Sequence, residues 1–271
     1  MFRLMQPSDL AAMKALWECK RGEPADFAEK AICRFAGTEN AYVAEENGQL
    51  QALVLAVPIS IRGRAGSYLY GLCSTDNGTA AGLVDFVCAQ QKQRGADFSV
   101  VVPSGAAQTE FFRSRGFAQA FALRCLNRPV RRNIWSQAEF DTITAKNLCE
   151  LRQKYAPNAV QMAPEQMAIV LGDLYSRGAT LISDSHGYGV YFRQDDTLYF
   201  VELLAEDDRA AETLMEAARE KEIIVEKAVV TIGAAQNLFL GEGTRMDYGM
   251  IRFEGAPFDV SETYMRLMLE N

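Results

Sequence analysis

The residues with the clearest chemical potential form a turn between an apolar segment and a helix. Residues 67–73 are apolar and aromatic, which is typical of a buried strand. Asp76, Asn77 and Gly78 mark a tight turn, and apolar residues then recur from Ala80 with the spacing of one helix face. The first N–H groups of a helix lack partners within it and lie at the positive end of its dipole, so such a turn can bind phosphate. The alternative is a turn whose glycine is needed only for steric reasons.

The segment after this turn carries a second pattern. Residues 98–102 indicate another buried strand, and the run FFRSRGF follows at residues 111–117. This run resembles the aromatic-aromatic-x-x-x-Gly-Phe segment of the GNAT superfamily, the acyl-CoA-dependent N-acyltransferases. Gly78, Thr79 and Ala80 match the second half of that family's Gln/Arg-x-x-Gly-x-Gly/Ala turn. The first half departs from it, because Thr75 or a gap stands where the family has Arg or Gln.

The resemblance implies an acyl-CoA site on this strand, turn and helix, with acetyl-CoA or another acyl-CoA as the donor substrate and no metal. A backbone N–H near Cys73 would polarise the thioester carbonyl. The family's tyrosine acid falls on Phe112, which cannot donate a proton. The residues expected to contact the donor are Leu72, Cys73, Ser74, Gly78, Thr79, Ala80 and Phe112.

Three residues are candidates for the missing chemistry. Tyr70 or Tyr68 could replace the acid, since alternate residues of a strand face one side, although each is also typical of an aromatic core. Cys73 could act as a nucleophile, but no base is placed beside it. The sequence does not identify a general base.

The order of predicted elements extends the resemblance along the chain. A strand, two helices, a hairpin and the strand-helix-strand unit fill residues 1–130, with 118–126 as the last strand. Residues 137–271 repeat the order and are predicted to end with a strand at 250–253 and a helix at 261–269. We therefore expect an α+β fold of two tandem GNAT-like domains, with mixed, mostly antiparallel sheets flanked by helices. The tandem relatives have a further C-terminal domain, so the role of their C-terminal carboxylate is not transferred to Asn271.

The second copy differs at the turn. Glu206, Asp207 and Asp208 precede its helix and no glycine is present. These carboxylates would satisfy the helix dipole and repel a pyrophosphate. We therefore predict one cofactor site per chain, in the first domain.

Composition limits the classes of partner. The 271 residues carry a net charge of −7, which argues against nucleic acid. Residues 1–130 hold 14 Lys and Arg against 12 Asp and Glu, whereas residues 131–271 hold 14 against 23. The acidic second half suits a cationic acceptor, or it is simply a solvated surface. The single histidine, His186, rules out a histidine-rich metal site. No signal peptide or membrane span is indicated, so we expect a cytoplasmic protein; a homo-oligomer is left open.

Two functions remain open from the sequence. The first is an N-acyltransferase, most simply an N-acetyltransferase, that moves an acyl group from acyl-CoA to a primary amine of a small acceptor by direct attack. The second is a catalytically weakened relative that acts as an acyl-CoA-binding sensor or a partner-binding module. The missing turn Arg and acid Tyr favour the second, and the retained Gly78, Thr79 and Ala80 favour the first.

Overall fold

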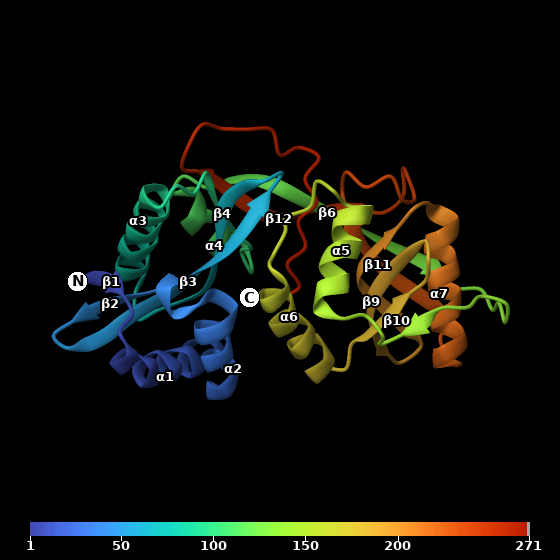
Figure 1. Ribbon diagram of the computed structural model, residues 1–271, viewed down its shortest axis with the longest axis horizontal. Helices are drawn as coiled ribbons and strands as arrows, with labels where there is room; N and C mark the ends of the chain where they lie inside the picture. The colour runs from blue at the N-terminus through green and yellow to red at the C-terminus, as the bar shows by residue number, and fades with distance from the viewer. Residues whose placement is uncertain (270–271) are drawn as a thin grey trace. The chain divides into compact units, whose positions relative to one another are not determined.

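The computed structural model describes residues 1–269, which form two compact units (Figure 1). Unit 1 comprises residues 1–120 and 249–259, and unit 2 comprises residues 121–248 and 260–269. Both units are mixed α/β structures in which helices flank a mostly antiparallel sheet, as predicted. Their bounds differ from the expected 1–130 and 137–271, since unit 2 begins at residue 121 and unit 1 includes residues 249–259.

Unit 1 is built on a sheet with the strand order β1-β2-β3-β4-β5-β12. All neighbours in it are antiparallel except β4 and β5, which are parallel. Its strands are β1 (Phe2–Leu4), β2 (Ala41–Glu46), β3 (Gln49–Ile61), β4 (Arg64–Ser74), β5 (Phe98–Val101) and the end of β12 (Thr244–Phe253). Its helices are α1 (Leu10–Arg21), α2 (Ala25–Lys30), α3 (Asn77–Gln93) and α4 (Ala106–Arg113), with a π-helical turn at Ala31–Ala36 and 3-10 turns at Pro7–Asp9 and Thr38–Asn40.

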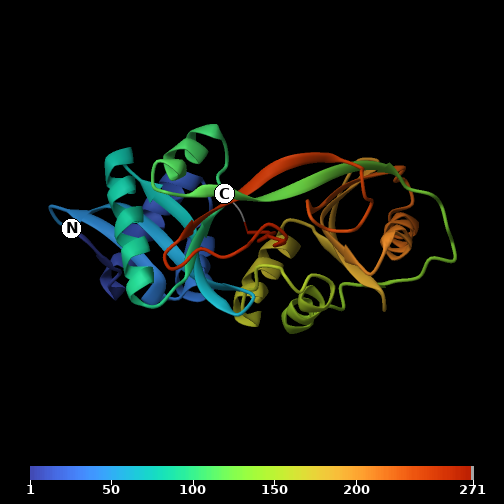
Figure 2. The same ribbon diagram turned by 90° about the horizontal axis from the view of Figure 1, so that it is seen from above.

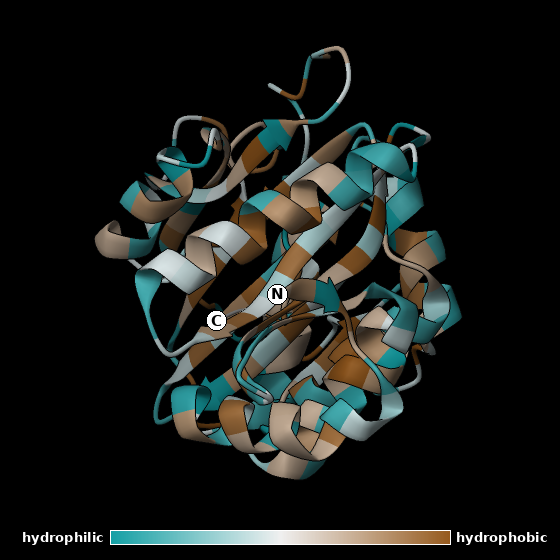
Figure 3. Cartoon of the chain, turned by 90° about the vertical axis from the view of Figure 1, so that its left-hand side faces the viewer, coloured by the Kyte–Doolittle hydropathy of each residue, from teal (hydrophilic) through white to brown (hydrophobic). Residues whose placement is uncertain are grey.

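The two faces of the unit 1 sheet carry different layers. Leu69 of β4 packs in one core cluster with Val84 of α3 and Phe112 of α4. Tyr70, the next residue of β4, instead contacts Trp17 of α1, with ring centroids 5.7 Å apart. Figure 2 shows α3 in teal and α4 in green, and in Figure 3 hydrophobic residues are frequent along the strands while the helices alternate hydrophilic and hydrophobic residues. Position along β4 therefore decides which layer a side chain faces.

Unit 2 repeats this plan with the strand order β6-β11-β10-β9-β8-β7. Its parallel pair is β10 with β11, and its core packs against α7. The strands are β6 (Ala118–Pro129), β7 (Glu139–Phe140), β8 (Thr180–Ser183), β9 (Gly187–Gln194), β10 (Thr197–Ala205) and β11 (Lys227–Gly233). The helices are α5 (Ala145–Tyr155), α6 (Pro164–Ser176) and α7 (Asp208–Glu222).

Three predictions about the strand order and the C-terminal segment were wrong. The strand predicted to close the first domain, 118–126, pairs with β11 in unit 2. The strand predicted to close the second domain, 250–253, pairs with β5 in unit 1. Residues 261–269 form no helix. Local periodicity indicates that a segment is extended but not which edge it joins, because any free strand edge satisfies its backbone groups equally well.

Candidate active site

The two parallel strands of unit 1 separate at their carboxyl ends. The last residues that pair β4 with β5 are Tyr68 and Val100, while β4 runs on to Ser74. On its other side β4 bulges, so that Gly71 and Leu72 together oppose one residue of β3. Gly71 has φ +66° and an added Cβ would lie 2.3 Å from the Trp17 ring, so only glycine fits there. The bulge and the separation leave a stretch of β4 backbone beside an opening in the sheet.

A pocket of about 290 Å³ lies in unit 1 at this opening. Its inner wall is apolar and aromatic, and its rim is formed by the turn before α3. The carboxyl end of a parallel strand pair is a common position for ligand sites in α/β proteins. The lining residues are Leu69, Leu72, Ser74, Thr75, Asp76, Asn77, Ala80, Val101, Ala107, Gln108, Phe111 and Phe112.

The predicted donor-contact residues divide into two groups. Leu72, Ser74, Ala80 and Phe112 line the pocket, whereas Cys73, Gly78 and Thr79 do not. The lining residues that sequence reasoning missed include Leu69 and Val101 from the two strands and Ala107, Gln108 and Phe111 from α4. Ala107 and Phe111 are four residues apart on one helix, and this spacing could have indicated that both face the same site.

The turn before α3 is closed by its own carboxylate. Asp76 is the N-cap of the helix, and its two carboxylate oxygens accept hydrogen bonds from Thr79 N (2.8 Å) and Thr79 Oγ1 (2.7 Å). The hydrogen bond from the Thr79 side chain, and then that from its backbone, lower the pKa of Asp76. The carboxylate is therefore ionised at neutral pH and occupies the positive end of the helix.

Tyr68 and Tyr70 lie on the face of β4 that is opposite the pocket. They are nearly inaccessible, with 0% and 1% of their surface exposed. Tyr70 packs within 5.7 Å of the rings of Trp17, Phe35 and Tyr68. The Arg21 guanidinium lies 5.1 Å from the centroid of the Tyr70 ring, and its Nη2 donates to the Tyr70 hydroxyl at 3.5 Å. Tyr70 is thus part of an aromatic core and also holds its hydroxyl beside a cation.

Cys73 is 1% exposed on the same face as Tyr70. Burial raises the pKa of its thiol to about 12. At neutral pH the group is protonated, and a protonated thiol is a poor nucleophile. This environment gives no support to the covalent role considered for Cys73.

Unit 2 has the same strand separation but a filled groove on its α7 face. The last pair of β10 and β11 is Phe200 with Val230. Beyond β11, Leu238 and Phe239 are buried in the core beneath α7. Asp207 caps α7 by accepting from Ala210 N at 2.8 Å, and Asp208 accepts from Phe239 N at 2.7 Å.

Arg124 of β6 holds this segment in place. Its Nη1 and Nη2 donate to four backbone carbonyl oxygens at 2.7–2.9 Å. The acceptors belong to Gln236, Leu238, Phe239 and Glu242. The position equivalent to the unit 1 pocket is therefore occupied by protein.

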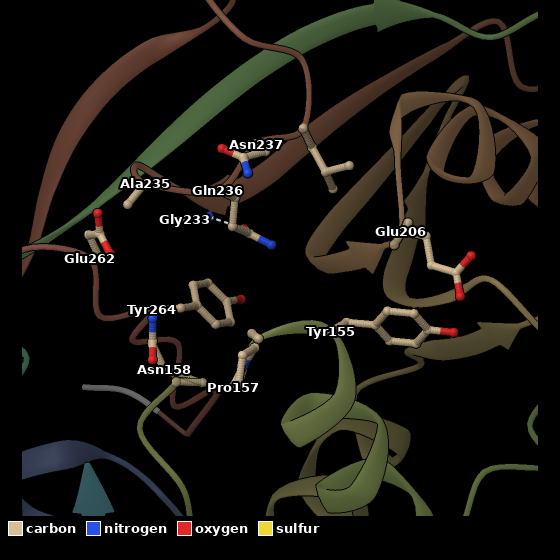
Figure 4. A pocket seen from close by; sticks show the side chains of 14 residues that line it. Tyr155, Pro157, Asn158, Glu206, Gly233, Ala235, Gln236, Asn237, Glu262 and Tyr264 are labelled. Carbon is tan, nitrogen blue, oxygen red and sulfur yellow. Dashed lines mark hydrogen bonds between the residues drawn. The ribbon is translucent and has the colours of Figure 1, made fainter. Parts of the chain in front are cut away.

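A different pocket of about 340 Å³ opens in unit 2 near the end of α5 (Figure 4). Gly233 N donates to Gln236 Oε1, which fixes the amide orientation of that side chain. The Tyr264 hydroxyl donates to Glu202, a buried residue of β10. Its labelled side chains are mostly polar: Tyr155, Asn158, Glu206, Gln236, Asn237, Glu262 and Tyr264. This lining lacks the apolar wall of the unit 1 pocket.

Within residues 1–269, no group of three or more His, Cys, Asp or Glu side chains is arranged to hold a metal ion. His186 Nδ1 lies 2.9 Å from Glu206 Oε2 at the surface of unit 2. Over the same described range, none of the helices has the length and apolar character needed to cross a membrane. Asn271 lies outside the described residues.

Comparison with known proteins adds to this geometry. No protein-family model matches the chain, and no curated protein matches it by sequence. Among solved structures it is similar to a probable N-acyltransferase from Enterococcus faecalis V583, with a TM-score of 0.75 at 15% identity, over 97% of this chain and 73% of that one. A GCN5-related N-acetyltransferase from Anabaena variabilis ATCC 29413 matches with a TM-score of 0.71 at 15% identity, over 94% of this chain and 73% of that one.

The organisation in two units also has a counterpart. A tandem GNAT protein from the clavulanic acid biosynthesis pathway matches with a TM-score of 0.52 at 12% identity, over 96% of this chain and 99% of that one. In this chain, the repeated element order and the two parallel strand pairs reproduce the same plan. The chain therefore has the fold of the GCN5-related N-acetyltransferases, present as two tandem copies.

Proposed function

We propose that this protein is an N-acyltransferase that moves an acyl group from an acyl-CoA-type thioester to a primary amine of a small acceptor. The observation that carries the proposal is the apolar pocket in unit 1, where β4 and β5 separate after Tyr68 and Val100. A slot of about 290 Å³ with an aromatic inner wall suits an extended, uncharged thioester arm. The amide groups of such an arm can pair with the β4 backbone beside the opening.

The proposed reaction is a direct attack. The amine nitrogen adds to the thioester carbon, and the developing oxyanion accepts a hydrogen bond from a β4 backbone N–H near Cys73. The intermediate then collapses, the C–S bond breaks, and the thiolate leaves and takes up a proton while the amine loses one. We assign Tyr70 as the candidate proton donor, because Phe112 has no acidic proton. In this proposal the donor arm lies on the α3 side of β4 and the reacting carbon lies at the gap between β4 and β5, so a proton from Tyr70, which is 1% exposed on the other face, has to pass through that gap.

A sensor or partner-binding role is the second candidate. It is favoured by Phe112 at the position where the family has its acid, and by the ionised Asp76 at the turn. A small cationic amine remains the proposed acceptor class for the enzyme, on the basis of the acidic second half of the sequence.

The test is an acyl-transfer assay with a panel of amines. Purified protein is incubated with acetyl-CoA or S-acetylpantetheine and with a polyamine, an aminoglycoside, an amino acid or a short peptide. We expect amine-dependent thiol release and an acetyl mass shift on at least one acceptor. Donor binding without an acylated product from any amine would support the sensor role. Absence of binding by either donor would contradict the enzyme and the sensor role and would leave only the partner-binding role.

A further inference from the structure

We infer that the unit 1 pocket recognises its donor through the pantetheine arm alone and does not bind the diphosphate of coenzyme A. This inference rests on the proposed function and narrows it to a donor class. Any acyl-pantetheine thioester would then serve, whether or not a nucleotide is attached.

The first support is that several backbone N–H groups of the turn already donate hydrogen bonds within the protein. Thr79 N donates to the Asp76 carboxylate at 2.8 Å and Ala80 N donates to Asp76 O at 3.2 Å. Asp76 N donates to Ser74 Oγ at 3.3 Å, and Thr75 N donates to Gln51 O at 2.9 Å. The N–H groups of Thr75, Asp76, Thr79 and Ala80 therefore already have acceptors within unit 1, which leaves fewer groups of the turn to cradle a phosphate.

The second support is charge. The N–H and hydroxyl of Thr79 stabilise an ionised Asp76 at the rim of the pocket. A diphosphate would bring further negative charge to this carboxylate at a helix end whose dipole it already satisfies. None of the pocket's lining residues within the described chain is Lys or Arg, so no cationic side chain there offsets the repulsion.

The third support is that the inner part of the pocket is intact. Leu69, Leu72 and Val101 from the strands and Phe111 and Phe112 from α4 form an apolar slot. In unit 2, by contrast, the equivalent groove is filled by Leu238 and Phe239. Unit 1 therefore keeps the slot for the arm while lacking the cradle for the phosphates.

The test compares three ligands by isothermal titration calorimetry: pantetheine, 4′-phosphopantetheine and coenzyme A. For the wild-type protein we expect dissociation constants within about threefold of one another, since the shared arm supplies the contacts. In Asp76→Ser the hydroxyl keeps the helix cap but removes the charge, so coenzyme A should bind about fivefold tighter with pantetheine unchanged.

Asp207→Ser is the matched control, because Asp207 caps α7 of unit 2 in the same way. It should leave the affinity for all three ligands unchanged. Wild-type protein that binds coenzyme A 100-fold more tightly than pantetheine would overturn the inference and leave the proposed function standing. Failure of all three ligands to bind would overturn the proposed function as well. The wild-type comparison decides the matter even if a variant does not fold.

Discussion

Replacing Glu202 with alanine is expected to lower the free energy of unfolding by about 3–5 kcal/mol, because it leaves a buried arginine without its counter-charge. Glu202 and Arg152 are 0% and 1% exposed, and Arg152 Nη1 lies 2.9 Å from Glu202 Oε2. The hydroxyls of Tyr188 and Tyr264 also donate to Glu202. Burial, followed by the nearby Glu202 charge, raises the pKa of both tyrosines well above the usual value, so both remain donors.

Urea unfolding measured by circular dichroism would test this expectation. Glu150→Ala is a control on α5, the helix that carries Arg152, since Glu150 is 63% exposed and lies 3.9 Å from Lys146. It should cost no more than about 0.5 kcal/mol. The double variant Arg152→Met with Glu202→Leu should regain part of the lost stability, because neither charge is then left unpaired while the Tyr188 and Tyr264 hydroxyls still lose their acceptor. Equal effects of Glu202→Ala and Glu150→Ala would contradict a structural role for the buried pair.

Replacing Ala107 with tryptophan is expected to weaken binding of pantetheine and coenzyme A by about 100-fold or more, since an indole in the slot displaces the apolar contacts of the arm. Ala107 is an exposed residue of α4 that lines the unit 1 pocket. Because the site is open to solvent, the larger side chain should not disturb the core. Calorimetric titration and initial rates of acetyl transfer would both report the loss.

Ala235→Trp provides the matched control. Ala235 is also exposed, and it lines the polar pocket of unit 2. This variant should bind the donor as the wild type does, with an unchanged melting temperature. Loss of donor binding in Ala235→Trp together with normal binding in Ala107→Trp would place the donor site in unit 2.

The sequence was sufficient to predict the local elements because their signals are local. Gly95 and Gly116 follow the helices α3 and α4 and have φ values of +86° and +84°, a conformation that favours glycine and makes this residue a local signal for a helix end. The hairpin over Asn47 and Gly48 is present between β2 and β3. The partners of β6 and β12 were not predictable, because pairing between distant strands depends on contacts that no short window of sequence contains.

The candidate site shows a similar limit. Simple alternation along β4 places Tyr68, Tyr70 and Leu72 on one face. The bulge at Gly71 shifts this pattern, so Leu72 lines the pocket with Leu69 while Tyr70 packs against α1. The role of Asp76 was visible as an Asp-x-x-Thr capping pattern, but it was interpreted only as a turn marker. A bulge has no comparable sequence signature beyond the glycine itself.

The central claim is that unit 1 holds the acyl donor in the slot between β4, α3 and α4. Hydrogen–deuterium exchange with a saturating, non-hydrolysable thioether analogue of S-acetylpantetheine tests it most directly. We predict slower exchange in peptides that cover residues 69–80 and 101–112, with no change in residues 233–238. Protection confined to residues 233–238, or no protection in either pocket at saturation, would contradict the claim.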